Sequence, residues 1–143
     1  RAVILCDKKI LVLKDLSHSN PNYVLPGGGI EFGESAHEAL RRELREEIGM
    51  DVSIGRFLGC FEQSFEHYRL GKLHDLALLF LVTMTIEEKT RVVSQEPRYE
   101  VCWVNKDELS VINFVPPELP KLLFEWLELD MSDAFRSGFK KDE

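Results

Sequence analysis

Short runs of apolar residues, separated by polar turns, divide much of this chain into segments that read as β-strands. Ala2–Cys6 and Ile10–Lys14 are two such runs, and the polar turn Asp7-Lys8-Lys9 joins them. Leu73–Thr85 is a longer apolar run, which predicts a strand buried on at least one face. Tyr99–Val104 indicates a further strand. These runs predict most of a β-sheet.

Between these runs, the sequence predicts one more strand-like segment and several connections. Val52–Glu66 alternates loosely between apolar and polar residues, and His67–Lys72 follows it as a hairpin turn. Leu16–Asn22 and Thr90–Arg98 are polar and are predicted to be loops. The chain has no internal repeat and no low-complexity linker, so we expect one domain, residues 1–129. Residues 130–143 are predicted to be a frayed, flexible tail.

Two segments have the periodicity of helices. Residues 36–48 follow Ser35, a good N-cap that forms a capping box with Glu38, and Gly49 can stop the helix in a left-handed conformation. Residues 117–129 begin with proline, and Lys106–Leu109 is predicted to be a helical turn. The core stripe of the later helix comprises Leu119, Leu122, Leu123, Trp126 and Leu127. Strands flanked by two separated helices predict an α/β (α+β) fold, an α/β/α sandwich around a mixed sheet.

The first helix carries glutamates where apolar residues are expected. On a helical wheel, its apolar arc comprises Ala36, Ala39, Leu40, Leu44 and Ile48. Glu43 and Glu47 fall inside this arc and Glu46 lies on its edge, whereas the arginines of the helix point away from it. Partly buried carboxylates that repel one another need a positive partner. A bound hard divalent cation, Mg²⁺ or Mn²⁺, explains such a cluster better than a solvated charged face does.

A glycine run directly precedes this helix. Tyr23-Val24-Leu25-Pro26 reads as a short strand, and Gly27-Gly28-Gly29 follows it. Glycines let the backbone approach a ligand closely, although a simple tight turn explains such a run equally well. A strand, a glycine loop and a helix in this order form a cradle for phosphate and metal, in which Gly27, Gly29 and Tyr23 are candidate substrate contacts.

Residues 28–50 match a complete family signature. Its fixed positions are Gly28, Glu34, Arg42, Glu43, Glu46, Glu47 and Gly49, followed by the apolar Met50. This pattern resembles the signature of the Nudix hydrolases, and the resemblance implies the same sandwich architecture. It also implies a metal site made by a glycine carbonyl and three glutamates, namely Gly28, Glu43, Glu46 and Glu47. Arg42 would orient a glutamate, with Glu46 as its (i, i+4) neighbour, and Glu34 and Gly49 would be structural.

Several candidates outside the signature have less support. Glu100 precedes a strand, and in many relatives a glutamate near such a strand reaches the metals or acts as the base; an exposed carboxylate at a strand start is the simpler interpretation. His67 and Tyr68 lie in a predicted turn and are candidates to contact substrate, although an ordinary surface loop is as good an explanation. The run Ser94-Gln95-Glu96-Pro97 resembles part of a motif in relatives that cleave dinucleotides, but it lies too far along the chain and is interpreted as coincidence.

The charge and composition of the chain restrict the kinds of partner and cellular setting that we expect. The net charge of −7 argues against binding to duplex nucleic acid. Cys6, Cys60 and Cys102 are scattered, which predicts free thiols in a reducing, cytoplasmic setting. Leu76–Val82 is an apolar run of seven residues, far from the roughly 20 needed to span a bilayer, and no signal peptide is apparent.

Because Arg1 opens inside strand-like sequence, we expect a few native residues before it. The oligomeric state stays open, a homodimer included.

These observations predict a Mg²⁺-dependent hydrolase of a P–O–P bond in a nucleoside diphosphate linked to another group. Glu47 or Glu46 is expected to orient the attacking water, with Glu100 as a third possibility. The signature does not reach the base or sugar, so oxidised nucleoside triphosphates, nucleotide sugars, ADP-ribose and dinucleoside polyphosphates all remain candidate substrates. The alternative is a catalytically silent nucleotide-binding or sensing domain of the same fold.

Overall fold

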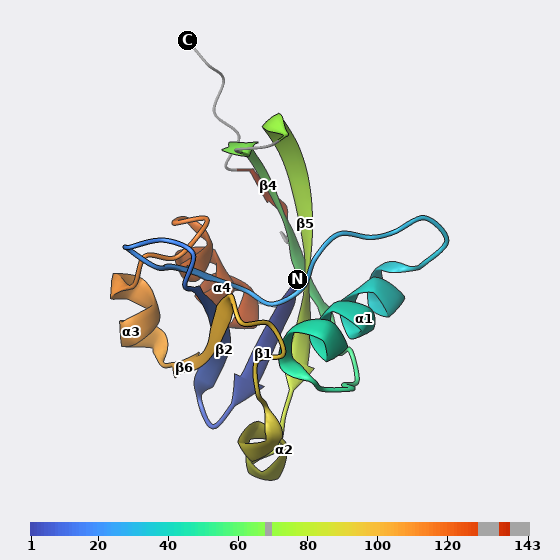
Figure 1. The fold of residues 1–143 in the computed structure, drawn as a ribbon, viewed down its shortest axis with the longest axis vertical. Helices are drawn as coiled ribbons and strands as arrows, with labels where there is room; N and C mark the ends of the chain where they lie inside the picture. The colour runs from blue at the N-terminus through green and yellow to red at the C-terminus, as the bar shows by residue number, and fades with distance from the viewer. Residues whose placement is uncertain (68–69, 129–134, 138–143) are drawn as a thin grey trace.

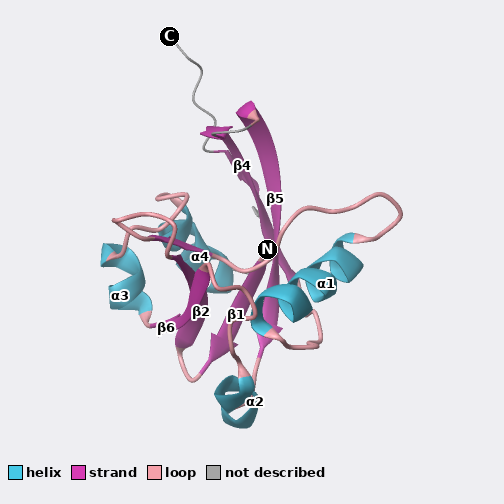
Figure 2. Ribbon diagram, viewed as in Figure 1, coloured by secondary structure: helices cyan, strands magenta, loops and turns pink. Residues whose placement is uncertain are grey.

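The computed structural model describes residues 1–67, 70–128 and 135–137. Its strands are β1 (Ala2–Cys6), β2 (Lys9–Asp15), β3 (Asn22–Val24), β4 (Phe57–His67), β5 (Gly71–Thr83), β6 (Tyr99–Val104) and β7 (Phe135–Ser137). Its helices are α1 (Ala36–Ile48), α2 (Ile86–Arg91), α3 (Lys106–Val111) and α4 (Leu119–Glu128). Figure 1 shows their arrangement, and Figure 2 separates helices from strands by colour.

The strands form one mixed sheet, as the sequence predicts. Its order is β3-β2-β1-β5-β4-β7, and β6 pairs with β2 outside this path. β1 runs parallel to β5, and β7 runs parallel to β4, whereas the other pairs are antiparallel. β2 is paired to β1 near its start, to β3 near its end and to β6 along most of its length. The end of β2 is therefore held between β3, which leads into the glycine loop, and β6.

Side chains that alternate along the strands pack into two separate hydrophobic cores. Val3, Ile10 and Val12 belong to a core shared with α3 and α4, which we call the α4-side core. Ile4 and Leu11, one residue away, belong to a core shared with α1, the α1-side core. The period of two along each strand sends neighbouring residues to opposite faces. Figure 1 shows α1 on one side of the sheet and α3 and α4 on the other, so the predicted α/β/α sandwich is confirmed.

The signals at both ends of α1 are confirmed. The Ser35 side chain accepts a hydrogen bond from the Glu38 backbone N–H, and Glu38 reaches back to the Ser35 backbone. Gly49 ends the helix at φ 69°, a left-handed conformation that favours glycine. Leu40, Leu44 and Ile48 are buried in the α1-side core, as their spacing predicts. Local sequence therefore defines the element that carries the glutamates.

Three elements differ from the predictions. Ile86–Arg91 form α2, which overlaps the start of the predicted loop; Thr85 and Glu88 make a capping box that signals this helix. Phe135–Ser137 form β7 within the predicted tail, because β4 offers them a free edge to pair with. β4 begins at Phe57, five residues later than predicted. Among the described residues, no helix is long and apolar enough to cross a membrane.

Candidate active site

Glu47 is the buried carboxylate at the centre of the site. Its residue is only 7% exposed, and its Oε2 accepts a hydrogen bond of 2.6 Å from the backbone N–H of Gly27. Burial raises the pKa of Glu47 from an ordinary value of 4.5 to about 7, although the bond from Gly27 opposes this change. The nearby charge of Glu43 raises it further. The carboxylate that the wheel placed in the apolar arc is thus packed against the glycine loop.

Glu43 reaches the same loop from one helical turn earlier. A methyl group added at Gly28 would clash with the Glu43 carboxylate unless that side chain moved, so glycine lets the loop pass close to the carboxylate where it stands. Gly27 has φ 112°, a conformation that other residues rarely adopt, and an added methyl group there would meet Leu40 at 2.9 Å. Two adjacent glycines therefore bring the backbone between the two glutamates of α1.

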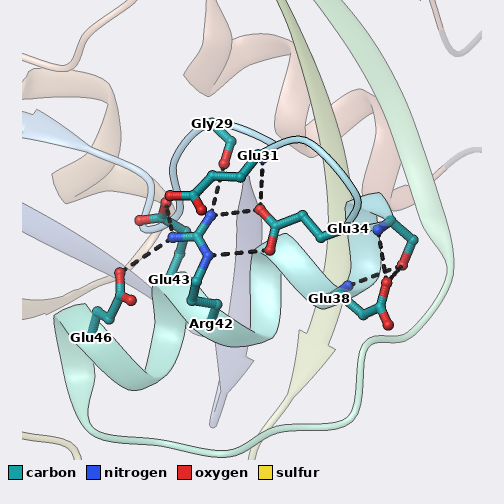
Figure 3. Close-up of polar contacts among 8 residues, drawn as sticks. Gly29, Glu31, Glu34, Glu38, Arg42, Glu43 and Glu46 are labelled. Atoms are coloured by element: carbon teal, nitrogen blue, oxygen red, sulfur yellow. Dashed lines mark hydrogen bonds and ion pairs between the residues drawn. The ribbon is translucent and has the colours of Figure 1, made fainter.

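Arg42 links the remaining signature residues, as Figure 3 shows. Its guanidinium donates two hydrogen bonds to Glu34, at 2.7 and 3.2 Å, and one to Glu43 at 2.8 Å. It also donates to Glu46 at 3.3 Å and to the carbonyl of Gly29 at 3.0 Å. The expectation that every arginine of the helix points away from the glutamates is wrong, because the long Arg42 side chain bends back along the helix surface.

Glu34 holds the guanidinium of Arg42 in place, which explains why Glu34 belongs to the signature. Glu34 accepts a hydrogen bond from the Glu31 backbone N–H at 2.7 Å in addition to both bonds from Arg42. The Arg42 guanidinium, followed by the Glu31 bond, holds the pKa of Glu34 below its usual range. Glu34 therefore stays ionised and fixes the guanidinium across the start of the helix.

A fourth carboxylate, for which the sequence suggests no role, belongs to a loop that lies against the end of α1. The backbone N–H of Gln95 donates to the carbonyl of Glu47 at 2.9 Å, so the loop before β6 lies against the end of α1. The charge of Glu96 contributes to the raised pKa of Glu47, after burial and the charge of Glu43. The run 94–97 is too far along the chain for the motif it resembles, but the fold returns it to the signature helix.

Glu100 and Tyr23 lie on the other face of the sheet. Tyr99 and Val101 pack against the α1-side core, so Glu100 between them points away from α1. It pairs with Lys14, whose Nζ lies 3.0 Å from Glu100 Oε2, and Tyr23 packs against the α4-side core. His67 is the last residue of β4, and Tyr68 lies outside the described residues. The structure does not bring Glu100 or Tyr23 to the glutamates of α1.

Comparison with known proteins agrees with this arrangement. The model of the family described as NUDIX domain matches residues 1–127. The chain belongs to the Nudix family. It is accordingly a Nudix-type pyrophosphohydrolase, an enzyme that acts on phosphorus-containing acid anhydrides.

The relatives of this Nudix hydrolase are named after several different substrates. The 8-oxo-dGTP diphosphatase of Buchnera aphidicola is 29% identical over 133 residues, which cover 85% of this chain and 92% of the relative. The nucleoside triphosphatase NudI of an Enterobacter species is 29% identical over 94 residues, 64% of this chain and 67% of the relative. A Caenorhabditis elegans Ap4A hydrolase shares the fold with a TM-score of 0.63 at 18% identity, covering 88% of this chain and 92% of that one.

The donor groups of this Nudix site suit the divalent ions that the family generally uses. Glu47 approaches Gly27 and Glu43 approaches Gly28, and all their donor atoms are hard oxygens. Glu47 is buried and accepts a backbone hydrogen bond, and among the described residues no ion pair joins it to a side chain; the charge of Arg1 lowers its pKa, but by less than burial raises it. Within the described ranges, no three carboxylate, imidazole or thiol side chains lie close enough together to hold a metal ion by themselves. Such a site fits a cation that one or two carboxylates share with substrate phosphates.

The raised pKa of Glu47 makes a prediction about stability. Because its folded-state pKa is about 7 and its ordinary value is 4.5, the folded protein binds the proton more tightly than the unfolded chain does. The metal-free protein should therefore lose up to about 3 kcal/mol of stability from this group as the pH rises from 4.5 to 7. Urea unfolding of wild type and Glu47→Gln across this range measures it. The difference between the two proteins should depend on pH; a constant difference would contradict the buried, raised pKa.

Proposed function

We propose that this chain hydrolyses a P–O–P bond in a nucleoside diphosphate linked to another group, at a Mg²⁺ site made by Glu43, Glu46, Glu47 and the carbonyl of Gly28. Mn²⁺ would serve as a substitute. The observation that carries the proposal is the buried carboxylate of Glu47, which is hydrogen-bonded to the glycine loop and, among the described residues, forms no ion pair with a side chain. The Nudix signature supplies the assignment of Glu46 and of the Gly28 carbonyl to the same site.

The surroundings of Glu47, Glu46 and Arg42 suit each side chain to a different role in the reaction. A bound divalent cation supplies charge neutralisation at the diphosphate and lowers the pKa of a water molecule. Glu47, whose pKa is about 7 without metal, is suited to take a proton near neutral pH. Glu46, with a side chain 56% exposed, is accessible from solvent, and Arg42 holds both Glu43 and Glu46 in place. The glycine backbone lets the diphosphate come close to these groups.

An apolar cavity on the other face of the sheet suits the nucleoside. It has a volume of about 370 Å³ and is lined in part by Leu25, Phe61 and Phe65. Leu25 lies two residues before Gly27, so the cavity adjoins the glycine loop. Aromatic and aliphatic side chains there can contact the face of a base, while Gln63 and Asp75 supply polar groups at its wall. The names of the relatives place nucleoside triphosphates, 8-oxo-dGTP included, first among the substrates to test.

The test is a product assay with a substrate panel. The purified protein is incubated with nucleoside triphosphates, 8-oxo-dGTP, nucleotide sugars, ADP-ribose and dinucleoside polyphosphates, with Mg²⁺ or with EDTA. We expect release of a phosphomonoester or pyrophosphate from at least one compound, and no release with EDTA. Turnover that survives chelation would contradict the metal site. Binding of nucleotides without turnover would instead support a silent nucleotide-binding domain.

Metal binding should stabilise the folded protein measurably. A cation that binds the folded cluster and not the unfolded chain stabilises it by about 1.4 kcal/mol at ten times its Kd. For a domain of this size, the melting temperature should rise by about 3–6 °C. Glu43→Gln and Glu47→Gln should remove most of this shift, which is measured by thermal unfolding with Mg²⁺ and with EDTA. Glu38→Gln is the matched control, because it lies on α1 but caps its start. An equal shift in all variants would place the cation elsewhere.

A further inference from the structure

The loop that carries Glu96 is held at several points. Its Gln95 backbone N–H donates to the Glu47 carbonyl at 2.9 Å. The Ser94 hydroxyl donates to the Glu96 carbonyl at 2.9 Å, and the Tyr99 N–H donates to the same carbonyl at 3.0 Å. These bonds fix the backbone on both sides of Glu96 and hold this loop against the end of α1. The loop would shift if its junction with the sheet shifted.

That junction is an ion pair between Asp15 and Arg98. Asp15 is the last residue of β2 and is only 5% exposed. Arg98 donates to both of its carboxylate oxygens, one of them from Nε at 3.1 Å, and the Ser17 N–H donates to Oδ1 at 2.9 Å. The Leu16 N–H also donates to the Arg98 carbonyl at 2.9 Å. A buried carboxylate is tolerated only with such partners, so the pair ties the loop firmly to the sheet.

The ion pair lies on the same face of the sheet as Glu47. Asp15 is the register partner of Tyr99, and Tyr99 packs against the α1-side core. The Arg98 guanidinium lies over the Tyr99 ring, 5.0 Å from its centre. Burial raises the pKa of Tyr99; the charge of Arg98 opposes this effect, and the charges of Glu47, Asp15 and Glu96 add to it. One continuous set of contacts thus connects the ion pair to the site.

We propose that Arg98, clamped by Asp15, is a positioning residue that holds Glu96 against Glu47 for the hydrolysis proposed above. The inference rests on that proposed function. The simpler alternative is that the ion pair only secures the end of β2. The two interpretations differ in one respect: a positioning role acts through Glu96 and disappears when the Glu96 carboxylate is removed, whereas a purely structural role does not.

A double-mutant cycle distinguishes the positioning role from the purely structural role. The kcat, the KM and the melting temperature are measured for wild type, Arg98→Gln, Glu96→Gln and the double variant, with Mg²⁺ and the best substrate of the panel. Arg98→Gln should lower kcat by up to about 10²-fold, the scale of a small misplacement of a reacting group, with little change in KM. In the Glu96→Gln background the same substitution should change kcat less than about twofold. Arg98→Lys should restore part of the loss.

Controls keep the result interpretable. Arg45→Gln removes an exposed ion pair with Asp51, at 3.0 Å on the surface of the protein, and should leave kcat unchanged in both backgrounds. Asp15→Asn replaces Arg98→Gln if the latter does not give folded protein. Equal losses in both backgrounds, or a Glu96→Gln variant as active as wild type, would overturn the positioning role alone. A wild-type protein without turnover on the whole panel would overturn the proposed function and the positioning role together.

Discussion

Replacing Glu47 by glutamine is expected to lower kcat by about 10²–10⁴-fold, the scale of a lost general base. The amide keeps the size of the side chain but cannot take a proton or contribute a negative charge to a cation. Glu47 is buried and accepts the hydrogen bond from the Gly27 N–H. Steady-state kinetics with the best substrate of the panel measure the effect, and the loss should appear in kcat more than in KM.

The same substitution at three other glutamates ranks their roles. Glu46→Gln should also lower kcat strongly if Glu46 contributes to the metal site, but less than Glu47→Gln because its side chain is solvent-exposed. Glu100→Gln should remain near wild type, because Glu100 points to the opposite face and pairs with Lys14. Glu38→Gln is the control on α1. A kcat loss at Glu100 greater than at Glu47 would contradict the site that we describe.

Arg42→Lys should lower kcat by about 10²-fold, although the charge is retained. The planar guanidinium contacts Glu34, Glu43 and Glu46 at once and also reaches the Gly29 carbonyl. A lysine ammonium is a single point of charge and cannot span these partners. Glu43 and Glu46 would lose their common support, and a higher Mg²⁺ concentration should be needed for half-maximal activity. Titration of activity with Mg²⁺ measures both quantities.

Arg45→Lys is the matched control for this substitution. Arg45 lies on the same helix and pairs with Asp51 at an exposed position, where a surface ion pair contributes little. Its replacement should change neither kcat nor the Mg²⁺ requirement. If Arg42→Lys behaves like this control, the contacts of Arg42 with the glutamates have no catalytic consequence, and its role is limited to the stability of the helix start.

Much of the fold follows from local sequence. The capping box at Ser35 and the stop at Gly49 predict both ends of α1, because capping hydrogen bonds involve residues only a few positions apart. The apolar runs predict β1, β2, β5 and β6, because the period of two is a property of each strand by itself. α2 was missed although Thr85 and Glu88 carry the same capping signal, since none of its residues is buried and its apolar pattern is weak.

The sequence by itself determined that, in this Nudix hydrolase, a glycine loop directly precedes a helix that carries three closely spaced glutamates. Their spacing is local, and a helix places residues four apart on one face whatever the surrounding fold. Only the tertiary structure decided which distant groups join them. The pairing of β6 with β2 turns Glu100 away and returns the loop of Glu96 to the end of α1, and the position of Glu34 bends Arg42 toward the glutamates. Strand register and long side-chain contacts depend on residues far apart in the chain, which no local pattern encodes.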